Sequence, residues 1–71
     1  MTQQEIQERI DQKPFKPFKV RLAGGEKIDV PTGDHAHLYP GGRTLFVHLD
    51  REGTKIIDVR LVTALEIKDT A

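Results

Sequence analysis

FKVRLAGGEKIDV, residues 18–30, is the stretch of this sequence that decides the fold. Phe18, Val20 and Leu22 alternate with charged residues, and Ile28 and Val30 do the same after a Gly-Gly pair. A period of two is typical of a strand with one buried face, and glycines between two such runs indicate a β-hairpin. The stretch therefore predicts an antiparallel hairpin with one apolar face and one charged face.

The register of this hairpin follows from matching its apolar faces. A two-residue loop at the glycines would place charged residues opposite apolar ones. A three-residue loop over residues 24–26 pairs Leu22 with Ile28 and Val20 with Val30, so that the two apolar faces coincide. We therefore predict the three-residue loop, with one glycine in the left-handed region of backbone conformation.

The N-terminus carries the pattern of a short helix. Residues 2–5 have the T-x-x-E spacing of a capping box. Ile6 and Ile10 lie four residues apart, on one face of a helix, and Pro14 ends it. We predict a helix within residues 1–13 that lies across an open end or edge of the sheet, because its apolar stripe is too thin to be stable alone.

Residues 18–67 predict antiparallel β structure throughout, divided by glycine and proline turn signals. Strands this short tend to bend into a small barrel that hides its edges. We therefore expect a single domain over residues 1–71, mainly β with one N-terminal α-helix and a strongly bent five- or six-stranded antiparallel sheet. After the hairpin, strands are expected at 35–39, 44–49, 55–59 and 61–67, with Leu45, Val47, Ile57, Val59, Leu65 and Ile67 facing inward.

Composition limits the classes of protein that fit. The 71 residues carry equal numbers of acidic and basic side chains and no cysteine. A domain of this size has a marginal core, and a net charge near zero favours association over nucleic-acid binding. No apolar stretch reaches the length of a membrane span, and the first residues lack the pattern of a signal peptide. We therefore expect a cytoplasmic homo-oligomer, with no membrane partner and no cofactor.

Two segments and the order of elements carry a resemblance to known proteins. Residues 18–25 resemble the first strand and turn of the bacterial Sm-like (Hfq-type) RNA chaperones, and residues 56–65 resemble their last strands. The chain also resembles a group of short uncharacterised bacterial proteins with a helix, a Pro-Phe-x-Pro-Phe connector (residues 14–18 here) and a hairpin. The resemblance implies an Sm-like or SH3-like small barrel that assembles by pairing of edge strands.

The resemblance does not extend to the RNA-contacting residues. A Lys-His pair near the end of the penultimate strand contacts RNA in the chaperones, whereas Asp58 and Val59 stand at the matching place here. An Asp and an Asn bind uracil in the eukaryotic-type family. Asp34 matches the former, but Leu38 stands where the latter belongs.

Three histidines are candidate metal ligands. A turn centred on the second glycine pair matches Leu38 to Leu45 and places His35 opposite His48, with His37 on the same face. Cross-strand neighbours on one face have Cβ atoms about 5 Å apart. Three imidazoles so placed fit Zn²⁺, Ni²⁺ or Cu²⁺. The alternative is an outward polar face that contains histidines without binding metal.

Two further groups of side chains are candidates for binding. Tyr39 and Phe46 are expected on that outward face, where the helix or a second subunit covers them, or where they stack on bases. Lys16, Lys19 and Arg21 form a basic strip that fits a phosphate backbone. The alternative for the strip is a solvated face on which acidic neighbours pair with the cations.

Catalysis has little support in the sequence. Serine and cysteine are both absent, and no general base is associated with a threonine hydroxyl. The glycine pairs lie in hairpin turns, so they do not form a phosphate-binding loop at a helix start. We therefore predict a non-enzymatic small binding or assembly module that binds itself or another protein. RNA or single-stranded nucleic-acid binding and histidine-based metal binding are the alternatives.

Overall fold

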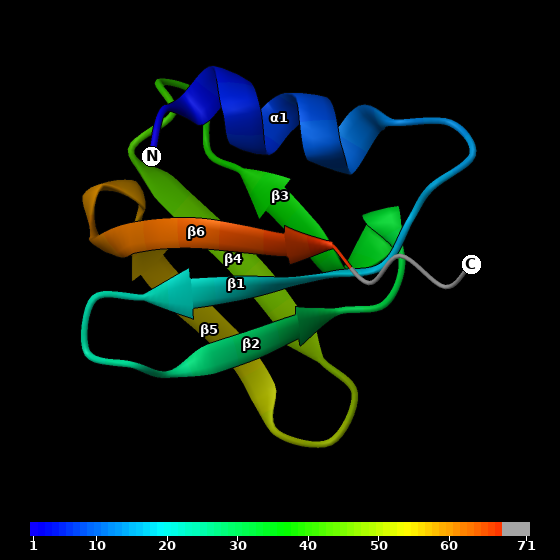
Figure 1. Ribbon diagram of the computed structural model, residues 1–71. Helices are drawn as coiled ribbons and strands as arrows, with labels where there is room; N and C mark the ends of the chain where they lie inside the picture. Colours follow the sequence, from blue (N-terminus) through cyan, green and yellow to red (C-terminus); the bar gives the residue numbers. More distant parts are fainter. Residues whose placement is uncertain (68–71) are drawn as a thin grey trace.

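The computed structural model describes residues 1–67 and shows a mainly β chain with one N-terminal helix (Figure 1). Residues 68–71 of the expected domain lie outside the described residues. The elements η1 and η2 are single 3-10 turns. In chain order, the described elements are α1 (Gln3–Asp11), β1 (Phe18–Leu22), β2 (Lys27–Val30), η1 (Gly33–His35), β3 (Ala36–Leu38), β4 (Thr44–Leu49), β5 (Gly53–Asp58), η2 (Val59–Leu61) and β6 (Val62–Ile67).

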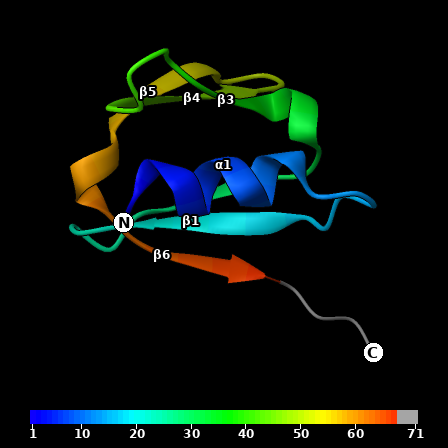
Figure 2. The same ribbon diagram turned by 90° about the horizontal axis from the view of Figure 1, so that it is seen from above.

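The strands of residues 1–67 form two three-stranded antiparallel sheets, so the prediction of one bent sheet closed into a barrel is wrong. The first sheet has the order β2-β1-β6 and the second has the order β3-β4-β5. Figure 2 shows them as two layers, with α1 along one open side. Hydrogen bonding between strands is interrupted at the two corners where the chain passes from one sheet to the other, after β2 and after β5. Pro31 has no N–H with which to continue β2, and Asp58 caps η2 before β6 begins.

The first hairpin has the predicted loop length but a different register. Val20 pairs with Ile28, whereas the sequence predicts Val30 opposite Val20. The three-residue loop covers residues 23–25, and its last residue, Gly25, has φ +95°. This loop type requires a left-handed residue at its third position, which glycine adopts without steric cost. The predicted loop would have placed a glutamate there. A shift of two residues leaves each side chain on its predicted face.

The helix is held by its cap and by one isoleucine. The Thr2 hydroxyl accepts a hydrogen bond from the Glu5 amide, and the Glu5 carboxylate accepts one from the Thr2 amide, both at 3.3 Å. The hydrogen bonds from Thr2 lower the pKa of Glu5. Ile6 is fully buried, and the Met1 amino group donates to the Val62 carbonyl at 3.0 Å. The prediction that the helix covers an open edge is confirmed (Figures 1 and 2).

The apolar core lies between the two sheets and beneath α1. Val20, Leu45 and Val47 are fully buried, as their alternation predicts. Leu65 is half-buried, and Ile67 lies opposite the buried Phe18, on the inner face as predicted, although it is 39 % exposed. It is the last residue of an edge strand, where the core no longer covers it. The buried apolar residues of the described chain are Ile6, Phe18, Val20, Ile28, Val30, Ala36, Leu45, Val47, Ile57, Val59 and Val62.

Asp58 fixes the corner at which the chain passes from the second sheet back to the first. Its carboxylate accepts hydrogen bonds from the Arg60 guanidinium at 2.8 Å and from the Arg60 amide at 2.9 Å. These hydrogen bonds, the side-chain bond first, lower the pKa of Asp58 from 3.8 to about 2. A carboxyl with a lowered pKa in the folded state stabilises the fold above its unfolded pKa. That contribution is lost as the pH falls through the folded pKa.

We expect the wild-type chain to lose more thermal stability than Asp58→Asn as the pH falls from 3.8 to about 2. Asparagine keeps a carbonyl oxygen that can accept from the Arg60 amide, but it binds no proton. The melting temperature of both chains, followed from pH 5 downward, checks this. Parallel profiles for the two chains would show that protonation of Asp58 does not affect the corner.

Candidate functional site

The outward side of the second sheet is the strongest candidate site. Leu45 and Val47 of β4 are fully buried, so Phe46 and His48, which alternate with them, face away from the core. Phe46 pairs with residues of both neighbouring strands, β3 and β5. This surface is called the outer face below. It carries His37, Tyr39, Thr44, Phe46, His48, Thr54 and Ile56.

Three large side chains make a continuous apolar patch on the outer face. The ring centroids of Tyr39 and Phe46 are 6.2 Å apart, and Phe46 lies directly opposite Ile56. Tyr39 is 60 % exposed and Ile56 is 71 % exposed. Apolar side chains that are exposed together, rather than singly, are typical of a surface that binds another molecule. The apolar patch, defined as Tyr39, Phe46 and Ile56, contains both residues that the sequence predicts for an interface.

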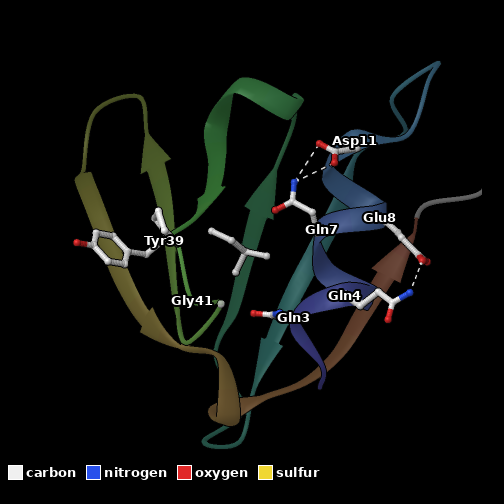
Figure 3. Close-up of a pocket in the computed structure, with 10 residues that line it drawn as sticks. Gln3, Gln4, Gln7, Glu8, Asp11, Tyr39 and Gly41 are labelled. Carbon is white, nitrogen blue, oxygen red and sulfur yellow. Dashed lines mark hydrogen bonds between the residues drawn. The ribbon is translucent and has the colours of Figure 1, made fainter.

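The helix does not cover the apolar patch, so that part of the prediction is wrong. Because Ile6 is buried in the gap between the sheets, α1 lies along the edge at β3 and not over the outer face. Figure 3 shows the Tyr39 ring directed away from the helix. Cover by a second subunit stays a prediction.

Ile56 is the patch residue that the sequence analysis does not single out. Ile56 and Ile57 are adjacent in a strand, so one of them must face outward, and Ile57 is the buried one. Its partner across the sheet depends on where β5 begins. Gly53, with φ +83°, lets the strand start two residues earlier than predicted, and the resulting register sets Ile56 opposite Phe46.

Two of the three predicted histidines come together at one end of the outer face. The predicted match of Leu38 with Leu45 is confirmed. His37 Nε2 lies 2.6 Å from His48 Nε2, and the two ring centroids are 4.6 Å apart. On its other side, His48 Nδ1 lies 2.9 Å from the Thr54 hydroxyl. We call His37 and His48 the histidine pair.

The third histidine lies elsewhere, so the predicted three-histidine cluster does not form. His35 ends the 3-10 turn η1, and its Nε2 lies 3.0 Å from the Asp50 carboxylate. Its Nδ1 lies 2.7 Å from the hydroxyl of Thr32, which caps the turn, so the ring lies between Thr32 and Asp50 of the β4–β5 loop. Within residues 1–67, no group of three or more His, Cys, Asp or Glu side chains is placed to hold a metal ion.

Carboxylates accompany the predicted basic strip. Lys19 Nζ lies 3.7 Å from Asp29, and Arg21 Nε lies 3.4 Å from Glu66. Both acids lie on the strands that flank β1, so the strip is part of a charge-paired face. Lys16 lies in the connector that precedes β1. Nucleic-acid binding through Lys16, Lys19 and Arg21 stays a prediction, and the local charge does not favour it.

A groove of about 670 Å³ separates α1 from the β3–β4 turn (Figure 3). Its helix side is polar. Gln4 donates to Glu8 at 3.3 Å and Gln7 donates to Asp11 at 3.0 Å, so these amides and acids are paired along the helix. The lining residues include no serine, cysteine, lysine or histidine. The groove therefore offers amide hydrogen bonds but no nucleophile with an adjacent base.

Over the described residues, no helix has both the length and the apolar character needed to cross a membrane. The chain matches no protein-family model, and comparison with curated proteins and with solved structures finds no match either.

Proposed function

We propose that this chain is a non-enzymatic assembly module of Sm-like architecture, whose copies associate through the outer face of the second sheet. The single observation that carries the proposal is the apolar patch of Tyr39, Phe46 and Ile56, which lies across neighbouring strands, with Phe46 half-buried between the exposed Tyr39 and Ile56. Burying such a patch against a partner removes apolar surface from water, which is the main driving force of association.

The chemistry of the outer face favours a second copy of the same chain as the partner. With neutral imidazoles, its side chains carry no formal charge, and Asp58 at the edge is paired with Arg60. Two copies can therefore meet face to face about a two-fold axis without like-charge repulsion. The net charge of zero acts in the same direction for the whole chain.

The small size of the domain gives association a thermodynamic role. A chain of 71 residues buries a limited share of its apolar surface by folding alone. Because a partner that binds the folded state shifts the unfolding equilibrium, association stabilises the fold by mass action. The outer face of the second sheet would then be buried between the two copies of the dimer.

The proposal is tested by sedimentation equilibrium of the metal-free chain, in EDTA, from about 1 µM to about 1 mM. We expect the apparent mass to rise with concentration from 8.0 kDa toward about 16 kDa. The melting temperature should rise over the same range, since dimerisation stabilises the folded state. A constant mass of 8.0 kDa over the whole range would overturn the proposal.

A further inference from the structure

We infer that His37 and His48 form half of a zinc site, and that a second copy completes the site with its own histidine pair. The inference rests on the proposed face-to-face association, because one copy supplies two ligands. It gives that association a regulator: a divalent transition metal that bridges the two outer faces with four imidazoles.

The geometry of the histidine pair is close to that of two ligands on one ion. The two Nε2 atoms face each other at 2.6 Å, and the ring planes are inclined at 66°. Zn–N bonds of 2.0–2.1 Å in a tetrahedral site place two ligand nitrogens about 3.4 Å apart. The pair therefore needs to open by about 0.8 Å, which small side-chain rotations of two exposed residues can supply.

Thr54 orients one of the rings for this role. Its hydroxyl lies 2.9 Å from Nδ1 of His48, on the side of the ring away from His37. When Nδ1–H donates to the hydroxyl oxygen, the lone pair of His48 is on Nε2, the atom that faces His37. Metal-binding histidines usually hold their second nitrogen in such a hydrogen bond, which fixes both tautomer and ring direction.

The site needs a second copy because a single outer face has too few ligands. Zinc usually takes four protein ligands in a structural site, and imidazole is among those that it prefers. No third His, Cys, Asp or Glu joins the pair within residues 1–67, and the nearby Asp50 is paired with His35. A two-fold axis that passes beside the histidine pair brings four imidazole nitrogens together, next to the apolar patch.

The test measures association with and without ZnCl₂, at a protein concentration where the EDTA sample is mostly monomeric. We expect zinc to tighten dimerisation at least about tenfold, with one zinc for every two chains. His37→Ala and His48→Ala should each abolish the zinc effect, and His35→Ala should retain it. The last variant is the matched control, since it also removes a surface imidazole near this sheet.

Co²⁺ provides a spectroscopic readout that does not depend on mass. The wild type should give the visible d–d bands of tetrahedral cobalt at half a metal equivalent per chain, and His48→Ala should not. Absence of a zinc effect on the wild-type mass, or an undiminished effect in His37→Ala and His48→Ala, would overturn the inference.

The same samples separate the two proposals. If the wild type dimerises in EDTA and zinc changes nothing, then the zinc site fails and the apolar interface stands. If the chain is monomeric in EDTA at all concentrations but dimeric with zinc through His37 and His48, then the metal-independent interface fails and the zinc site stands.

Discussion

Leu45→Ala should lower the free energy of unfolding by about 2–5 kcal/mol. Leu45 is fully buried in β4, the central strand of the second sheet, between Leu38 and Ile57. Truncation removes apolar contacts and leaves a cavity, because strands fixed by their ladders cannot collapse into the space. A domain of 71 residues is stable by about 4–11 kcal/mol in total, so the variant should lose a large share of its stability.

The matched control is Leu61→Ala, the same chemical change at a side chain that is 52 % exposed. We expect its effect to stay within about 0.5 kcal/mol. Urea denaturation of the three chains, followed by far-UV circular dichroism at one protein concentration, measures both differences. Equal losses for Leu45→Ala and Leu61→Ala would mean that the core does not lie between the two sheets.

Ile56→Glu should weaken self-association by about a hundredfold or more, which corresponds to about 2.7 kcal/mol. Ile56 is 71 % exposed in the single chain and lies on the edge strand β5, opposite Phe46 of the central strand. In a face-to-face dimer, the introduced carboxylate would be buried without a partner, and its own copy would face it across the two-fold axis. In the monomer the same side chain remains in water, so the fold should be retained.

The control for this second variant is Leu61→Glu, which introduces the same charge at an exposed leucine of η2, away from the outer face. Sedimentation equilibrium of both variants in EDTA should give a monomer for Ile56→Glu and wild-type behaviour for Leu61→Glu. If Ile56→Glu still dimerises as the wild type does, then the copies associate elsewhere. Edge-strand pairing through backbone hydrogen bonds, as the Sm-like resemblance implies, would give that result.

Alternation predicts which face of each strand is buried, but it does not predict how the strands are grouped. Val20 and Val47 are in the core because, with side chains alternating along each strand, only one orientation of the strand buries its apolar residues. The hairpin register differs by two residues, a shift that leaves the pattern unchanged and that the position of Gly25 decides. The division into two sheets depends on the corners at η1 and η2, where side-chain caps and backbone turns outweigh strand propensity.

The candidate site was predictable where it depends on the register of one hairpin. The match of Leu38 with Leu45 places His37 and His48 on the same face, and they are in contact. The position of His35 depends on its partner Asp50, fifteen residues away in the chain, and periodicity carries no information on that contact. Ile56 lies in the patch because Gly53 sets the register between β4 and β5. The spacing of the charged residues in the β4–β5 loop does not reveal this register.

The place of β1 between β2 and β6 has a consequence for how the chain is made. The first strand completes its ladder with the last, pairing Val20 with Leu65 across most of the sequence. A nascent chain can form the first hairpin early, but its second edge stays open until Ile67 has left the ribosome. Such long-range pairing slows folding. Until β6 pairs with it, β1 presents an unpaired edge to chaperones and to neighbouring polypeptides.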